Sequence, residues 1–232
     1  MKKSYIVTLL VCFLLIPATL YLGTKLPGRR YYITVTLILL ELMLPMFAVF
    51  EGRKPQAREL VIIAVLSAMA IAGRVAIPIP DFKAIFAIIM LSGIAFGPET
   101  GFMVGAISAF ASNFFYSQGL YTPWQMFSYG LGGMLAGFLF GKGRLPQNRW
   151  LMAIFGFVTV VVLIGPIMDS MTFFLGFAKF TWGNFALVFG SGFAHNCLNG
   201  GCTAAVMLIF GKPFLGILNR VQVKYGMLEQ VR

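Results

Sequence analysis

The chain has 232 residues, of which 59% are hydrophobic and 11% are charged. Soluble domains carry roughly 25% charged residues, so this composition excludes a soluble globular protein. The net charge of +11 does not indicate nucleic-acid binding, because the Lys and Arg residues lie in short clusters between long apolar runs. The pattern predicts an all-α integral membrane protein threaded through a lipid bilayer.

Eight apolar segments follow one another along the chain, and each is expected to be a transmembrane helix. They are approximately 5–24, 31–50, 59–77, 83–97, 100–116, 123–141, 150–175 and 184–210. A crossing needs about 20 residues, so the fourth segment is short and the last two are long. The first segment follows Lys2 and Lys3 and could be a signal peptide, but no clear cleavage site lies near Pro17, which favours an uncleaved span.

The basic residues predict the orientation of the chain. With the N-terminus inside, the cytoplasmic segments hold most of the 18 Lys and Arg residues, as the positive-inside rule requires. Both termini are then cytoplasmic, and the plasma membrane is the expected location. The first outer loop is an exception, since it holds Lys25, Arg29 and Arg30. A hairpin at 1–56 that was added to a six-helix domain at 57–232 would account for this exception.

Small residues recur every fourth position in three segments. The stripes consist of Ala64, Ala68 and Ala72, then of Gly97, Gly101, Gly105 and Ala109, and then of Gly133, Gly137 and Gly141. Small side chains at this spacing let helices approach closely inside a membrane. We expect the two glycine stripes to pack inside the protein. The alanine stripe fits either internal packing or contact with a partner protein.

Polar and aromatic side chains from several segments converge on the expected outer side. They are Asn113, Tyr116, Gln118, Tyr121, Trp124, Gln125, Asp169, His195, Asn196 and Asn199. An aromatic belt at the membrane interface would explain the Tyr and Trp residues equally well. It does not explain the amides, because an amide buried in lipid needs a hydrogen-bonding partner. The set therefore predicts a pocket for a polar, ring-containing small molecule.

The sequence contains no motif for metal binding or catalysis. His195 is the only histidine and has no nearby carboxylate, so we expect no metal site, and the three cysteines have no zinc-ligand spacing. No Walker motif, catalytic triad or HExxH motif is present. We therefore expect no enzyme activity and no intrinsic cofactor, and any energy for transport must come from another chain.

Residues 57–210 resemble a known family of membrane proteins. Arg58-Glu59-Leu60 before the alanine stripe, then Gly73-Arg74 and Pro80-Asp81-Phe82-Lys83, are similar to the substrate-binding S-components of energy-coupling factor (ECF) vitamin transporters. The runs at 96–106, 112–115 and 122–126 extend the resemblance, which is most specific at 97–126. The first two segments look like an addition to the six-helix core of that family.

The resemblance implies a subunit that captures a vitamin outside the cell and docks on a transmembrane coupling protein with two ATPase subunits. It implies that Ala64, Ala68 and Ala72 form the docking surface, and that the whole subunit topples to carry its site inward. The polar set above would bind the vitamin. A gating loop would close over the site and would contain Arg74, Asp81, Phe82 and Lys83.

The vitamin itself stays open at this point. The run 97–126 most resembles the cobalamin-type S-components of lactic-acid bacteria, and an amide-rich site with aromatic walls would suit cobalamin as the transported ligand. The same side chains would suit riboflavin, thiamine or a queuosine-like base. A stand-alone secondary carrier or small channel is the alternative from another class. A membrane-embedded enzyme is disfavoured, because no paired carboxylates or activated nucleophile are present.

Overall fold

A computed structural model describes residues 3–24, 31–76, 83–141, 143–177 and 180–225. In these ranges every regular element is a helix. The helices are α1 (Lys3–Leu10), α2 (Ile16–Thr24), α3 (Tyr31–Gly52), α4 (Ala57–Val75), α5 (Ile85–Phe96), α6 (Pro98–Tyr116), α7 (Thr122–Phe140), α8 (Arg149–Val158), α9 (Gly165–Gly176) and α10 (Trp182–Lys224). Short π-helical stretches, Val11–Leu15 and Thr159–Ile164, join α1 to α2 and α8 to α9 without a break. The all-α prediction is confirmed for the described residues.

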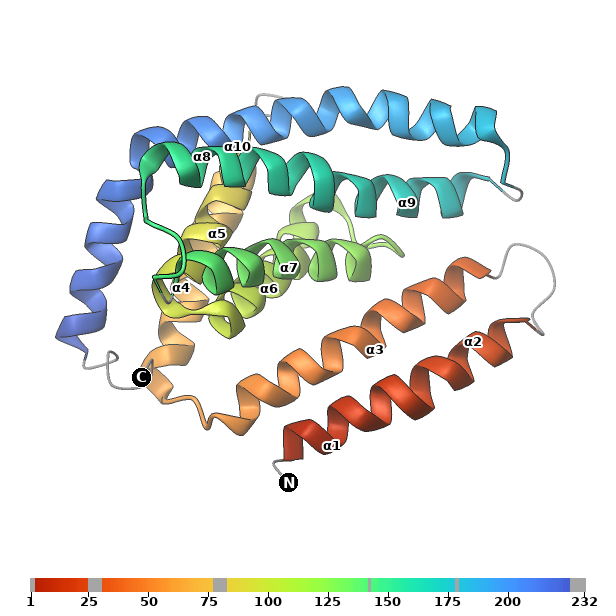
Figure 1. Ribbon diagram of the computed structural model, residues 1–232, viewed down its shortest axis with the longest axis horizontal. Helices are drawn as coiled ribbons and strands as arrows, with labels where there is room; N and C mark the ends of the chain where they lie inside the picture. Colours follow the sequence, from red (N-terminus) through yellow and green to blue (C-terminus); the bar gives the residue numbers. More distant parts are fainter. Residues whose placement is uncertain (1–2, 25–30, 77–82, 142, 178–179, 226–232) are drawn as a thin grey trace.

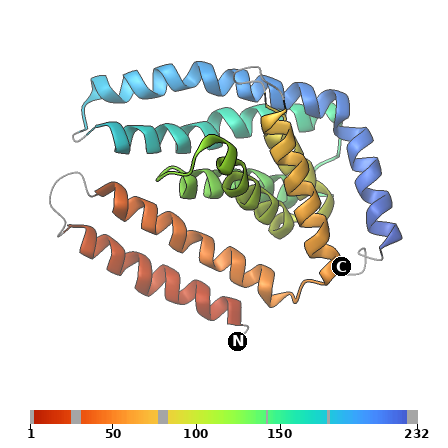
Figure 2. The same ribbon diagram turned by 180° about the vertical axis from the view of Figure 1, so that it is seen from behind.

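The helices form three groups in space. Figure 1 and Figure 2 show α8, α9 and α10 along one side of the molecule, α1–α3 along the opposite side, and α4–α7 between them. Four continuous helical stretches are long and apolar enough to cross a membrane: Ile6–Gly23, Tyr32–Gly52, Arg149–Gly176 and Trp182–Lys224. These spans and the composition identify an integral membrane protein.

Local sequence signals mark where several helices begin. Pro98 and Pro123 lie in the first turns of α6 and α7, where the missing N–H of proline costs no hydrogen bond. Gly97, with φ of +95°, makes the sharp turn between α5 and α6 that other residues rarely adopt. The side chain of Thr181 accepts a hydrogen bond from the Asn184 backbone N–H and caps α10.

Helix α10 is much longer than one crossing requires, with 43 residues. It contains Pro213, and Figure 1 shows the blue end of this helix turning sharply away from α8. Proline removes a backbone hydrogen bond and clashes with the preceding turn, so a bend here is expected. After the bend, Gln222 donates to the Ala95 carbonyl oxygen, and the Tyr225 carbonyl oxygen accepts from Arg58 at the surface.

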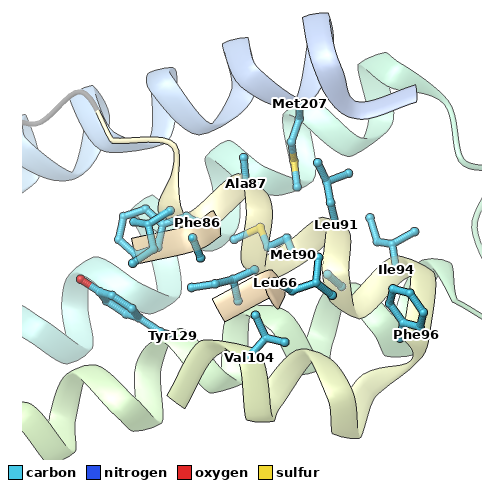
Figure 3. Close-up of a cluster of buried hydrophobic side chains, with 14 of the residues drawn as sticks. Leu66, Phe86, Ala87, Met90, Leu91, Ile94, Phe96, Val104, Tyr129 and Met207 are labelled. Atoms are coloured by element: carbon cyan, nitrogen blue, oxygen red, sulfur yellow. The ribbon is translucent and has the colours of Figure 1, made fainter. Parts of the chain in front are cut away.

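The core is centred on α5, which contacts α4, α6, α7 and α10. Because α5 is surrounded, its side chains are buried all round, and this explains its nearly continuous apolar sequence. Figure 3 shows Met90 and Leu91 of α5 between Leu66 of α4 and Met207 of α10. Phe86 meets the Tyr129 ring edge to face, with centroids 4.8 Å apart.

The two glycine stripes lie in the interface between α6 and α7. A Cβ added to Gly101 would collide with the Gly133 carbonyl oxygen, and one added to Gly133 would collide with the Gly101 carbonyl oxygen. Further along, a Cβ on Gly105 would come within 2.5 Å of the Tyr129 carbonyl oxygen. The predicted internal packing of the glycines is therefore confirmed.

The N-terminal hairpin is packed against the rest of the chain through α3. This helix contacts α6, α7 and α9. The rings of Phe47 and Phe102 lie 6.0 Å apart, and the Trp124 indole N–H donates to the Thr36 hydroxyl at 3.1 Å. Within the hairpin, the Thr19 hydroxyl donates to the Glu41 carboxylate at 2.5 Å. The added hairpin is thus in direct contact with the helices that build the candidate site.

Candidate substrate pocket

Arg74 lies at the last turn of α4 and is 7% exposed. Its guanidinium donates to the Asn113 side-chain oxygen at 3.0 Å and to the Ser112 hydroxyl. A buried charge is tolerated only when its donors are satisfied, and α6 supplies these acceptors. The contacts fix Arg74 against the C-terminal end of α6.

Asn113 continues this hydrogen-bond chain into α7. Its amide nitrogen donates to the Gln125 side-chain oxygen at 2.8 Å and to the Thr122 hydroxyl at 3.0 Å. Asn113 is fully buried, and its oxygen is occupied by Arg74. It therefore links three helices. The Gln125 oxygen is used here, so the group that Gln125 can offer elsewhere is its NH₂.

A pocket of about 210 Å³ lies beside this chain of bonds. It is lined by Arg74, Lys83, Ile85, Phe86, Gln125, Tyr129, Val160, Ile164, Gly165, Met168, Asn196 and Asn199. Two cations and three amides thus share one space with two aromatic rings and several aliphatic side chains. None of the described lining residues is an acid. Such a pocket can hold a flat ring against its apolar wall and can hydrogen-bond the polar edge of that ring.

The wall on the opposite side comes from α9 and α10. The Asn196 amide nitrogen donates to the Asp169 carboxylate at 2.8 Å. The Asn199 amide donates to the His195 carbonyl oxygen at 3.0 Å, one turn earlier in the same helix. Asn196 and Asn199 line the pocket, whereas Asp169 and His195 are not among its described lining residues.

The ring of Tyr116 lies against both cations, Arg74 and Lys83. Its ring centroid lies 4.8 Å from the Arg74 guanidinium and 5.5 Å from the Lys83 ammonium, which are cation–π distances. Its hydroxyl donates to the Arg74 carbonyl oxygen at 3.1 Å. Tyr116 thus connects the end of α6 with both ends of the segment between α4 and α5.

The other predicted site residues of this region make local or structural contacts. Gln118 donates to the Phe110 carbonyl oxygen at 2.9 Å, and the Tyr121 hydroxyl bonds the Ser117 carbonyl oxygen. Trp124 is buried between Thr36 and Phe174, whose ring centroid lies 5.9 Å away. None of these three lines the described pocket. Asp81 and Phe82 of the predicted gating loop lie outside the described residues.

The structure therefore brings only some of the sequence-predicted site residues together. Arg74, Lys83, Gln125, Asn196 and Asn199 line one pocket. Asn113 and Asp169 stand directly behind the amides of Gln125 and Asn196, respectively. The sequence analysis missed Tyr129 and the apolar wall. An apolar residue inside a membrane helix carries no signal that separates a pocket wall from a lipid-facing surface.

The alanine stripe of α4 points away from the core. Ala64, Ala68 and Ala72 are all exposed, whereas the buried side of this helix holds Ile63, Leu66, Ser67, Ala70 and Arg74. The stripe is therefore not internal packing among the described residues. Helix α4 thus carries a pocket cation on its buried side and a smooth surface of small residues on its exposed side.

In the part of the chain that the structure describes, no group of three metal-ligating side chains occurs.

Comparison with known proteins places these features in a family. A UPF0397 protein of Vibrio atlanticus (strain LGP32) is 31% identical over 120 residues, which cover 48% of this chain and 65% of that protein. No solved structure matches the chain. The family model described as "ECF-type riboflavin transporter, S component" matches residues 54–214, which include α4 to α9 and most of α10. The chain therefore belongs to the family of ECF-type riboflavin transporter S-components.

Proposed function

We propose that this protein is the substrate-binding subunit of an ECF-type importer and that it captures riboflavin or a vitamin of similar size in the pocket between α4, α7 and α10. The observation that carries the proposal is the pocket itself. Two cations and three amides line the same space as the rings of Phe86 and Tyr129 and several aliphatic side chains. A riboflavin ring has the matching chemistry, with an apolar side and an edge of carbonyl and N–H groups.

The volume of the pocket bears on which vitamin fits. Ligand pockets of drug-sized molecules measure about 300–1,000 Å³, and this one holds about 210 Å³. A tricyclic ring could enter with a small outward movement of side chains, while its flexible tail stays at the mouth. Cobalamin is several times larger than riboflavin and would require the helices to separate. Cobalamin, which the run at 97–126 favours, is therefore the second candidate.

The partners follow from the family and from α4. We propose that the exposed surface of Ala64, Ala68 and Ala72 receives the transmembrane coupling protein of an ECF module. Small residues let two helices approach closely where water supplies no driving force. Two ATPase subunits on that module would supply the energy. In the same proposal both termini are cytoplasmic, and the pocket opens toward the outer leaflet.

The ligand is identified by titrating the purified protein in detergent with riboflavin, cobalamin and thiamine separately. Quenching of riboflavin fluorescence and shifts in the cobalamin absorbance report binding directly. We expect saturable 1:1 binding of riboflavin with Kd below about 1 μM, which corresponds to about 8 kcal/mol. Absence of binding of every compound below that concentration would contradict the proposal. Tight binding of cobalamin alone would establish the second candidate.

Docking is tested separately with Ala68→Leu, which places a bulky side chain on the exposed stripe. We expect vitamin uptake by cells that also express an ECF module to be abolished, while the Kd of the purified subunit stays unchanged. Met69→Phe enlarges an exposed side chain elsewhere around α4 and serves as the matched control, with uptake retained. Loss of binding and uptake together in Ala68→Leu would contradict a docking role. Uptake that survives ATP depletion would instead identify a secondary carrier.

A further inference from the structure

We propose that Asp169 is a positioning residue that holds Asn196 with its side-chain oxygen directed into the pocket, so that Asn196 acts as a hydrogen-bond acceptor for the substrate. This inference rests on the proposed function. It concerns a pair in which one partner, Asn196, lines the pocket and the other, Asp169, stands behind it.

Asp169 and Asn196 lie in the contact between α9 and α10, where each side chain faces a glycine of the other helix. Gly165 precedes Asp169 by four residues on α9, and Gly192 precedes Asn196 by four residues on α10. A Cβ on Gly192 would overlap the Asp169 carboxylate, and a Cβ on Gly165 would overlap the Asn196 amide. Each polar side chain thus lies directly against the glycine of the facing helix. The two glycines thus leave the space that the side chains of Asp169 and Asn196 occupy.

The chemistry of the pair sets the direction of the Asn196 amide. A carboxylate only accepts hydrogen bonds, so Asn196 must turn its NH₂ toward Asp169, and the observed distance from its nitrogen to the carboxylate is 2.8 Å. The Asn196 oxygen is then the group on its other side. If residue 169 were an amide, either end of Asn196 could face it, and the orientation would no longer be imposed.

The amide of Gln125 is oriented the other way, with its NH₂ group rather than its oxygen available to the pocket. Asn113 donates to the Gln125 oxygen because its own oxygen accepts from Arg74. Gln125 is therefore left with its NH₂ as a donor. The pocket then presents an acceptor from α10 and a donor from α7, together with the cations Arg74 and Lys83. This combination suits a ring edge on which an N–H group lies beside carbonyl groups, as on the pyrimidine ring of a flavin.

The test is a double-mutant cycle on riboflavin binding with Asp169→Asn, Asn196→Asp and the exchange Asp169→Asn/Asn196→Asp. The exchange restores an amide-to-carboxylate bond with reversed roles, and the second oxygen of the new carboxylate still faces the pocket. We expect Asn196→Asp, which places two carboxylates in contact, to weaken binding by about 10-fold. Asp169→Asn should weaken it by about 2-fold, because about half of the Asn196 side chains would then face the wrong way, and the exchange should return the Kd to within about 1.5-fold of the wild type. All of these side chains are close in size, so a role in packing alone would leave the Kd values nearly unchanged.

Two further variants test whether the effect is specific to the contact between Asp169 and Asn196. Ser170→Ala is the matched control, because the Ser170 hydroxyl donates to the Pro166 carbonyl oxygen of its own helix and does not line the described pocket, and its Kd should equal the wild-type value. Gly192→Ala displaces Asp169 without altering any lining residue and should weaken binding as Asp169→Asn does. An exchange variant that binds no better than the single variants, or Asp169→Asn with wild-type Kd, overturns the inference. A wild-type protein that does not bind riboflavin would instead overturn the riboflavin proposal.

Discussion

The α6–α7 and α9–α10 interfaces both contain glycines, but the glycines serve different purposes. Between α6 and α7, Gly101 and Gly133 bring the two backbones into contact, so the space that a side chain would need is filled by main-chain atoms. Between α9 and α10, Gly165 and Gly192 make room for the Asn196 and Asp169 side chains. The first interface is made of backbone and cannot adjust, whereas the second is made of polar side chains that can rotate.

The α6–α7 interface is therefore the rigid frame of the pocket, whereas the side chains at the α9–α10 interface can adjust. Asn113 lies near the C-terminal end of α6 and Gln125 near the N-terminal end of α7, so the tight interface fixes one wall of the pocket. On the opposite wall, Asn196 donates a side-chain hydrogen bond to Asp169 across α9 and α10. We therefore expect changes at the first interface to affect stability and changes at the second to affect binding.

The largest effect is expected for Gly133→Ala. Its new Cβ would collide with the Gly101 carbonyl oxygen, which belongs to the backbone and cannot move independently. Overpacking of this kind costs about 3 kcal/mol in the free energy of unfolding. The measurement is thermal unfolding in detergent. The control is Gly216→Ala in α10, where no atom lies within 4 Å of the added Cβ and no loss is expected. Equal unfolding temperatures for both variants would contradict the rigid-frame interpretation.

Arg74→Gln should rank second. It removes a buried cation from the pocket and takes a charged donor from Asn113 and Ser112. Hydrogen bonds to a charged group contribute about 2 kcal/mol, so riboflavin binding should weaken by about 30-fold. Arg74→Lys keeps the charge and should lose less. A Kd that responds identically to both substitutions would show that the geometry of the guanidinium has no role.

Gly165→Ala should have a smaller effect, and it should weaken riboflavin binding rather than lower the free energy of unfolding. The added methyl group presses on the flexible Asn196 side chain rather than on backbone. We expect riboflavin binding to weaken by about 10-fold while the free energy of unfolding changes by less than about 1 kcal/mol. Isothermal titration and thermal unfolding on the same preparation separate the two quantities. A loss of stability as large as that of Gly133→Ala would remove the distinction between the two interfaces.

The smallest effect is expected for Thr36→Val at the contact between the N-terminal hairpin and the core. The substitution removes the acceptor of the Trp124 indole N–H at similar volume. The loss of one hydrogen bond should lower the free energy of unfolding by about 1 kcal/mol. Riboflavin binding should not change, because neither residue lines the described pocket. A change in Kd would mean that the hairpin takes part in the binding site.

Much of the fold could be predicted from the sequence, because helices in lipid must be apolar and must satisfy their own backbone hydrogen bonds. Within the described residues, each of the eight apolar segments overlaps a helix, and the glycine spacing at 97–109 and 133–141 predicted the tight interface. The packing of α3 against α6, α7 and α9 was not predictable, since apolar side chains fit lipid and protein equally well. The length of α10 was also underestimated, because its last turns continue beyond the apolar run.

The site was predictable in its composition but not in its arrangement. Amides near one end of α6 and of α7 and further inside α10 indicated a polar site, and Gln125, Asn196 and Asn199 do line one pocket. Sequence alone could not separate these residues from Asn113, which bonds only to protein side chains among the described residues. That distinction depends on which neighbouring helix supplies the partner. It requires coordinates rather than spacing.

We propose that the substrate binds between Arg74, Gln125 and Asn196. The decisive measurement is the ratio of the riboflavin Kd of Gln125→Glu to that of the wild type. The substitution keeps the volume and the oxygen that accepts from Asn113, but it replaces the donor on the pocket side with a second acceptor. We predict a Kd at least about 10-fold higher, with little change in unfolding temperature. An unchanged Kd would contradict the account, because the ligand would then bind elsewhere.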